Sequence, residues 1–361
     1  MSDKPTKQLH DLGQSIWLDY ITREILDDGT LEGYIRELSV TGLTSNPTIF
    51  DKAISGGHAY DDQMTELREK GLDPEPLFFE LAISDLQRAA DLFRGAYDAS
   101  DTVDGFVSLE VSPKLAFDTE ATIAQAAELH ERGQRDNIYI KIPGTPEGLP
   151  AIEESIFAGV PINVTLLFDR EQYLAAAEAY MRGIERRIEA GLDPDVRSVA
   201  SIFMSRWDVA VADQVPAELK NTLGIAIGKR AYAAYRELLD SDRMQKLESE
   251  GARPQRLLWA STGTKDPEAP DTLYIEAFAS PNTVNTMPEK TLLAFADHGE
   301  VGEPMPADGG DSEEVLAKFA EAGVDVDELA ARLQKDGAEI FVKSWNDMVD
   351  SISQEAEKLA S

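Results

Sequence analysis

Short apolar runs alternate with longer amphipathic stretches along nearly the whole chain. Short runs rich in β-branched and aromatic residues predict strands, whereas apolar residues repeated every three or four positions predict helices. The last of the predicted strands has the weakest pattern. The runs predict strands at residues 15–20, 40–47, 105–111, 137–145, 161–168, 199–205, 256–262 and 283–287.

Amphipathic stretches between these runs predict the helices. Two or three helices are expected between residues 58 and 99, and two terminal helices follow an acidic loop at 297–311. Asp169 is the expected N-cap of a helix that runs to about residue 190. One helix is predicted between residue 288 and the acidic loop. The remaining helical stretches are predicted at about 22–38, 119–132, 146–157 and 207–250.

Strands that alternate with helices predict an α/β fold, and eight of them in series favour a (β/α)₈ TIM barrel with extra helices. We expect a single domain over residues 1–361, with a C-terminal helical extension from about residue 311. The alternative is an open doubly wound sheet, which usually carries a glycine-rich first turn. The chain has no GxGxxG motif. Residues 224–229 fall one residue short of a phosphate loop and lie in a helical pattern, so we predict a helix there.

Polar side chains occur at alternate positions of the predicted strands, so they share one face. In a barrel that face points inward, and catalytic groups lie at its carboxyl-terminal end. Each buried polar group needs a partner, and so many of them converging on one axis are hard to explain by packing alone. The pattern therefore predicts a catalytic site built from Asp19, Asn46, Glu110, Lys141, Asn163 and Thr165.

Lys141 lies in the middle of the apolar run 137–145. A buried ammonium group must be paired with an anion or give up its proton. A lysine that gives up its proton is a nucleophile, and its common use is to form a Schiff base with a carbonyl group. The alternative is a lysine at a frayed strand end whose ammonium group reaches solvent. The polar residues on the neighbouring strands favour the catalytic interpretation.

Composition excludes several classes of function. The formal net charge of −33 disfavours nucleic acid and anionic membranes as partners, and a phosphate site in such a chain needs its own local cations. There is no cysteine, which excludes disulfides, thiolate zinc sites and cysteine nucleophiles. With four histidines and no HExxH motif, no metal site is expected. Neither a signal peptide nor a membrane span is recognisable, so we expect a cytoplasmic protein.

Several motifs in this order resemble the transaldolase family. They are Gly-Leu-Thr-Ser-Asn-Pro-Thr-Ile-Phe at 42–50, Tyr-Ile-Lys-Ile-Pro at 139–143, Ile-Asn-Val-Thr-Leu-Leu-Phe at 162–168 and Ser-Ile-Phe-Met-Ser-Arg at 201–206. Residues 260–265 and 282–288 are similar to the longer bacterial form, and the similarity covers about residues 16–288.

The resemblance implies a Schiff-base enzyme of the non-oxidative pentose phosphate pathway, without metal or cofactor. Its substrates would be sugar phosphates. It would transfer a dihydroxyacetone unit from sedoheptulose 7-phosphate to glyceraldehyde 3-phosphate, giving erythrose 4-phosphate and fructose 6-phosphate, and the reverse.

The resemblance also implies roles for individual residues. Lys141 would be the Schiff-base nucleophile, and Asp19 the general acid/base that takes the proton of the C4 hydroxyl. Glu110 and Thr165 would hold the water that carries protons to and from the carbinolamine. A positioned carboxylate within hydrogen-bond reach suits the proton-transfer roles.

The substrate-binding residues follow from the same motifs. Arg206 would anchor the phosphate with Ser261 beside it, since a guanidinium fork suits phosphate. Shorter family members carry a second arginine just after this serine, where the chain reads Gly-Thr-Lys at 263–265. Lys265 is the expected replacement, as a point charge without bidentate geometry, which leaves the preferred sugar length open. The donors to substrate hydroxyls would be Asn46, Asn163 and Ser201.

Three other functions remain open on the sequence alone. A Schiff-base aldolase that releases free dihydroxyacetone would use the same residues. A sugar-phosphate isomerase has no need of Lys141, and a catalytically silent binding protein would not need the full polar set. The oligomeric state and the role of the acidic C-terminal region are not predicted.

Overall fold

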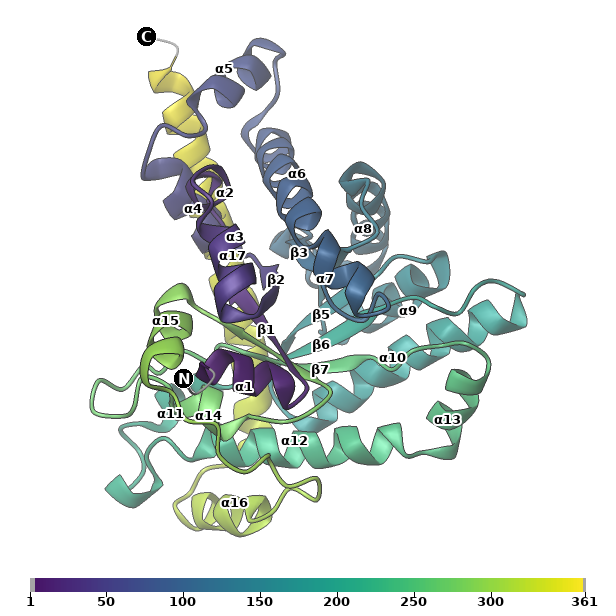
Figure 1. Cartoon of the computed structure of the whole chain (residues 1–361), viewed down its shortest axis with the longest axis vertical. Coiled ribbons are helices and arrows are strands. Elements are labelled where there is room, and N and C mark those ends of the chain that lie inside the picture. The colour runs from purple at the N-terminus through teal and green to yellow at the C-terminus, as the bar shows by residue number, and fades with distance from the viewer. Residues whose placement is uncertain (1–3, 360–361) are drawn as a thin grey trace.

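The computed structural model describes residues 4–359 and forms a closed barrel of eight parallel strands, β1 to β8, in sequence order. Helices surround the strands, which gather at the centre of Figure 1. The predicted (β/α)₈ barrel is confirmed. The strands are β1 Gln14–Asp19, β2 Val40–Thr44, β3 Val107–Glu110, β4 Ile138–Pro143, β5 Ile162–Leu167, β6 Ser198–Phe203, β7 Arg256–Ala260 and β8 Thr283–Met287.

The helices connect the strands and extend the chain beyond them. Those before β5 are α1 Pro5–Asp11, α2 Arg23–Asp27, α3 Thr30–Leu38, α4 Pro47–Ser55, α5 Asp61–Glu69, α6 Pro74–Leu92, α7 Arg94–Ala99, α8 Thr119–Gly133 and α9 Gly148–Ala158. Those after β5 are α10 Arg170–Glu189, α11 Ser205–Val211, α12 Leu223–Leu239, α13 Asp242–Ser249, α14 Leu273–Ala277, α15 Glu289–His298, α16 Ser312–Glu321 and α17 Val326–Lys358. Short 3₁₀ turns occur at Pro113–Leu115 and Ala217–Leu219.

Local capping explains where several helices begin. Asp169 accepts a hydrogen bond from the Gln172 backbone N–H at 2.7 Å and caps α10, as predicted. The predicted helix at 22–38 is instead two helices, α2 and α3, because Gly29 between them has a left-handed φ of 81°. Residues 224–229 lie inside α12, so the prediction of a helix there is confirmed.

Helices α1, α4 and α14 were not predicted. All three are short, with five to nine residues. Such lengths give too few turns for an amphipathic pattern to be recognised. Helix α4 does have a local start signal, because the Asn46 side chain accepts from the Ile49 backbone N–H at 3.1 Å and Pro47 occupies the first helical position.

Strand register places the polar residues of neighbouring strands at one level of the barrel. Glu110 on β3 is opposite Lys141 on β4, and Lys141 is opposite Asn163 on β5. Asp19 on β1 is opposite Thr44 on β2. Glu110, Lys141, Asp19 and Thr44 lie in the carboxyl-terminal half of their strands. Asn163 lies near the start of β5, and register brings it to the level of Lys141.

Helix α17 closes part of that end. It lies beside α4, and in Figure 1 it is the long yellow helix. The Gln334 side chain on α17 donates to the carbonyl oxygens of Gly144 and Leu166, both at 3.0 Å, so α17 is fastened to the carboxyl ends of β4 and β5. The helical segment expected from about residue 311 consists of α16 and α17.

The domain limits 1–361 stay a prediction, and residues 1–3 and 360–361 lie outside the described part. Within residues 4–359, no helix combines the length and apolar character that crossing a membrane requires.

Candidate active site

Lys141 projects from the centre of β4 into the barrel and is only 6% exposed. Its Nζ lies 3.2 Å from Glu110 Oε2 and donates to the Ser45 carbonyl oxygen at 3.1 Å. A buried ammonium group is expected either to pair with an anion or to lose its proton, and in the structure Lys141 is paired with Glu110. The ammonium and carboxylate groups lie within hydrogen-bond distance and are shielded from water, so a proton can pass directly from the amine to the carboxylate.

Glu110 is the partner that can take this proton. Its side chain is 4% exposed, and this burial raises the pKa of the Glu110 carboxyl above its ordinary value, although the positive charge of Lys141 acts in the opposite direction. Glu110 Oε1 is buried and has no hydrogen-bond partner among residues 4–359. The same is true of Thr165 Oγ1 on β5. Both oxygens can therefore accept a further hydrogen bond.

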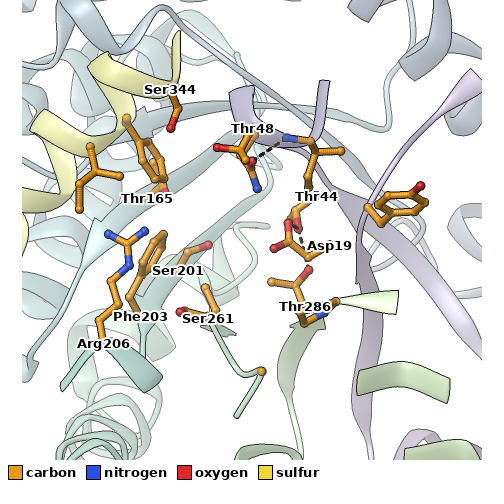
Figure 2. Close-up of a pocket in the computed structure, with 18 of the residues that line it drawn as sticks. Asp19, Thr44, Thr48, Thr165, Ser201, Phe203, Arg206, Ser261, Thr286 and Ser344 are labelled. Atoms are coloured by element: carbon orange, nitrogen blue, oxygen red, sulfur yellow. Dashed lines mark hydrogen bonds between the residues drawn. The ribbon is translucent and has the colours of Figure 1, made fainter. Parts of the chain in front are cut away.

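Asp19 ends β1 and faces the same cavity, as Figure 2 shows. The Thr44 hydroxyl donates to Asp19 Oδ1 at 2.9 Å and lies 2.7 Å from the Thr286 hydroxyl. Burial raises the pKa of the Asp19 carboxyl, while Lys141, the Thr44 hydrogen bond and Lys265 lower it. The result is a second carboxyl group with a raised pKa, held in a fixed orientation.

Ser201 and Asn163 form a hydrogen-bonded chain across three strands. The Ser201 hydroxyl donates to Asn163 Oδ1 at 2.7 Å, and Asn163 Nδ2 donates to the Ser108 hydroxyl at 3.1 Å. Asn163 is fully buried and lies behind the cavity wall, whereas Ser201 lines the cavity. The geometry makes Asn163 a support for Ser201, and its role as a direct donor to substrate stays a prediction.

One cavity of about 450 Å³ brings most of the predicted residues together. Glu110 and Asn163 do not line it; Glu110 contacts Lys141 and Asn163 contacts Ser201 from behind. A volume of this order suits a small metabolite. The predicted residues that line the cavity are Asp19, Asn46, Lys141, Thr165, Ser201, Arg206, Ser261 and Lys265.

Cations without carboxylate partners gather in this cavity. Arg206, Lys265 and Lys52 line it, and none of them has an ion pair within 4.0 Å among residues 4–359. Figure 2 shows the Arg206 guanidinium facing the same hollow as Ser201 and Ser261. In a chain with a net charge of −33, such a group of cations gives the cavity a positive local charge that favours an anionic ligand.

Arg206 is held between aromatic rings. Its guanidinium lies 4.9 Å from the centre of the Phe203 ring and 5.7 Å from that of Phe341 on α17. Burial lowers the pKa of Arg206, and the Glu110 carboxylate partly offsets this, but a guanidinium stays protonated in proteins. Arg206 Nη1 is buried and has no hydrogen-bond partner in the described part of the chain. The rings therefore hold in place a guanidinium that lines the cavity and has one donor without a partner in the described residues.

Two residues of the site have an unusual backbone conformation. Ser261 has φ 54° and Leu166, directly after Thr165, has φ 59°, both in the left-handed region that residues other than glycine rarely adopt. The register of β5 with β6 is irregular at this point. Such strain is commonly found at functional sites, where it directs side chains that a regular strand would not present.

The site contains residues that the sequence did not identify. Alternation places Thr44 on the polar face of its strand with Asn46, but no role in the site was predicted for Thr44. Lys52 lies on the unpredicted helix α4. Phe341 and Ser344 come from α17, some 200 residues after Lys141, and no local pattern indicates that this helix crosses the barrel.

No group of three or more histidine, aspartate or glutamate side chains between residues 4 and 359 has the arrangement to hold a metal ion.

The fold and the site define an α/β-barrel protein with a buried lysine–carboxylate pair in a cation-lined cavity. The family model of transaldolase/fructose-6-phosphate aldolase matches residues 16–352, and the chain belongs to this family. The resemblance found in the motifs is thereby confirmed.

Curated relatives agree over nearly the whole length. The transaldolase of Parafrankia sp. (strain EAN1pec) is 44% identical, covering 99% of this chain and 100% of the relative. That of Mycolicibacterium smegmatis is 45% identical over 94% of each chain. That of Thermobifida fusca is 43% identical over 97% of this chain and 98% of its own.

Proposed function

We propose that the chain is a transaldolase that moves a dihydroxyacetone unit from fructose 6-phosphate or sedoheptulose 7-phosphate to an aldose phosphate, in the cytoplasm. One observation carries the proposal. A buried lysine paired with a carboxyl of raised pKa shares a cavity with cations that have no carboxylate partner. The first feature suits imine formation with a ketone, and the second suits a phosphate at the far end of the same molecule.

The reaction begins with a proton transfer from Lys141 to Glu110, which lie 3.2 Å apart. The free amine attacks C2 of the ketose and forms a carbinolamine. Loss of the C2 hydroxyl as water, after protonation, gives a protonated imine, which can accept an electron pair. Thr165 Oγ1 and Glu110 Oε1 have no other partner in residues 4–359 and can hold the water that carries these protons.

Asp19 acts in the second step. It takes the proton of the C4 hydroxyl as the C3–C4 bond breaks, and the electron pair of that bond moves into the imine to form an enamine. Glyceraldehyde 3-phosphate leaves when fructose 6-phosphate is the donor, and the three-carbon unit stays on Lys141. The enamine then attacks the carbonyl of the second aldose, Asp19 returns the proton, and hydrolysis of the imine releases the new ketose.

The remaining residues position the substrate. Asn46 uses its side-chain oxygen to cap α4, which leaves its NH₂ group free to donate to a hydroxyl. Ser201 is oriented by Asn163, and the Ser261 hydroxyl lies 2.9 Å from that of Ser205 beside Arg206. Arg206 and Lys265 bind the phosphate.

The second candidate is an aldolase that releases free dihydroxyacetone, an activity that the family description also names. The relatives described above are all named transaldolase, so this alternative is not favoured. Turnover of fructose 6-phosphate, measured with and without erythrose 4-phosphate, tests the choice. We expect release of glyceraldehyde 3-phosphate beyond one equivalent per chain only when erythrose 4-phosphate is present. Equal sustained release without it would contradict transfer.

Arg206→Ala should raise KM for phosphorylated substrates roughly 10–100-fold, because it removes a charge-assisted contact. Unphosphorylated fructose should react little differently in the variant and the parent. Arg182→Ala, which removes an exposed arginine paired with Glu153, is the control and should leave KM unchanged. Equal losses with both substrates would remove Arg206 from the phosphate site.

Gly337→Val should displace the Arg206 side chain, because Gly337 lies on α17 next to it. A Cβ at this position would lie 3.2 Å from Arg206 Nη1 and 3.0 Å from Leu166 Cδ2, so the larger side chain must displace them. We expect the free energy of unfolding to fall by about 1–3 kcal/mol, as overpacking usually costs, and KM for phosphorylated substrates to rise. In the control, Gly33→Val on α3, the new Cβ has no atom within 4 Å apart from its chain neighbours and the backbone of its own helix. An unchanged KM in Gly337→Val would show that α17 does not position Arg206.

Thr44→Val should move the acidic limb of the kcat/KM profile to higher pH. Burial raises the pKa of Asp19, and the Thr44 hydrogen bond is one of the interactions that lower it. Its loss leaves the ionised form less stable, so Asp19 must be titrated at higher pH before it can act as a base. Profiles of kcat/KM against pH for the two proteins provide the measurement, and a shift to lower pH would contradict this role of Thr44.

A further inference from the structure

We propose that the amino-terminal end of the barrel holds a second binding site, for a small phosphate monoester. A cavity of about 390 Å³ lies there, a size that suits a small metabolite. Its wall includes Tyr139 near the start of β4 and Arg256 at the start of β7, together with the end of α12. The catalytic cavity opens at the other end of the same strands, so the two sites are separate.

Arginines dominate the wall of this cavity. There are four of them, against the two carboxylates of Asp240 and Glu248, which are both exposed. Such a concentration of positive charge is unexpected in a chain with twice as many acidic as basic residues. The four are Arg197, Arg236, Arg253 and Arg256.

Two of the arginines are neutralised by carboxylates outside the cavity wall. Arg197 Nε lies 2.8 Å from Asp195 Oδ1, and Arg253 Nη2 lies 2.5 Å from Asp101 Oδ2. Because of these ion pairs, no ligand is needed to explain the presence of Arg197 and Arg253.

The other two have no carboxylate within 4.0 Å among residues 4–359. Arg256 donates only to neutral oxygens, the Ser15 hydroxyl at 2.7 Å and the carbonyls of Thr283 and Val103 at 2.9 and 3.3 Å. Arg236 makes one long hydrogen bond, 3.5 Å to the Tyr232 hydroxyl. Its Nε is buried and has no partner in the described residues. A buried donor without a partner is destabilising unless something else satisfies it.

The capping role that a cation often has at the end of a helix does not account for Arg236. A cation in the last turn of a helix can stabilise it by bonding the terminal carbonyl groups. Arg236 lies in the last turn of α12, yet it donates to no carbonyl oxygen of that helix. Its guanidinium is instead turned to the cavity, where Arg256 supplies a second unpaired charge.

The chemistry of the wall indicates the ligand. Guanidinium groups bind phosphate oxygens through paired N–H donors, which an ammonium group cannot do. Burial raises the pKa of Tyr139, so its phenol keeps its proton at neutral pH and can donate as well. The Tyr139 hydroxyl makes no hydrogen bond within residues 4–359, and Tyr139 lines the cavity. Three donors without carboxylate partners thus face one space large enough for a phosphate monoester.

Calorimetric titration with sn-glycerol 3-phosphate tests this site, because the compound has no carbonyl group to react with Lys141. The titration uses the Arg206→Ala protein, in which the catalytic phosphate anchor is removed. We expect it to bind glycerol 3-phosphate and not glycerol. Adding Arg236→Gln should raise Kd at least tenfold, whereas adding Arg182→Gln should leave it unchanged.

Activity separates this site from catalysis. In the otherwise unchanged protein, Arg236→Gln should leave kcat and KM as they are, since Arg236 lies at the opposite end of the barrel. If Arg236→Gln failed to fold, Arg256→Lys, which keeps the charge and removes the fork, should raise Kd instead. No binding to the Arg206→Ala protein, or an equal Kd with and without Arg236, would overturn the proposal. Neither result would bear on the transaldolase reaction.

Discussion

Lys141→Met is expected to keep the fold and to lose turnover by on the order of 10⁴-fold or more, because no other group can form the imine. Methionine is apolar and close to lysine in length, so it suits the interior of β4. The substitution removes the cation paired with Glu110, but burial already raises the pKa of that carboxyl, and it can become neutral by taking up a proton. Steady-state assays and thermal unfolding provide the two measurements.

Lys114→Met is the matched control. Its ammonium group lies on the surface, with 44% of the side chain exposed, and pairs with Glu75. We expect this variant to retain activity. Activity above a few per cent in Lys141→Met, or a comparable loss in Lys114→Met, would contradict the assignment of the nucleophile.

Substitution of Asp19 and of Glu110 should block the reaction at different steps. General acid/base groups contribute roughly 10²–10⁴-fold each, so Asp19→Asn and Glu110→Gln should both lose that much turnover. Asp19→Asn should still form the imine and then stop before cleavage, because the C4 proton has no acceptor. Glu110→Gln should form the imine slowly, because Lys141 cannot transfer its proton to an amide.

Single-turnover experiments can separate these steps. Borohydride trapping over time measures imine formation, and release of glyceraldehyde 3-phosphate measures cleavage. We expect normal trapping and no release with Asp19→Asn, and slow trapping with Glu110→Gln. Both variants blocked at the same step would show that the roles are assigned wrongly.

The barrel was predictable because its strands are local features. Each run carries its own apolar pattern, and even the weakest, 283–287, corresponds to β8 Thr283–Met287. The points at which one helix ends and the next begins were less predictable. The helical pattern over 22–38 continues through Gly29, and only the backbone conformation of that residue divides it into α2 and α3. Short helices such as α4 have too few turns to leave a pattern.

The site was partly predictable for the same reason. Alternation within each strand placed Asp19, Lys141 and Ser201 on the inner face, and barrel geometry brings inner faces together. The roles of these residues stay predictions. Contacts between distant segments could not be predicted: the placement of Phe341 against Arg206 depends on where α17 packs, and the support of Ser201 by Asn163 depends on strand register.

The central claim is that Lys141 forms the Schiff base, and borohydride trapping followed by peptide mapping tests it most directly. Borohydride added with fructose 6-phosphate reduces the imine to a stable amine. We expect irreversible inactivation and one adduct per chain, located in the segment 136–145 and absent from Lys141→Met. An adduct on Lys114, Lys229 or Lys265 in place of Lys141, or no adduct in a fully active protein, would contradict the account.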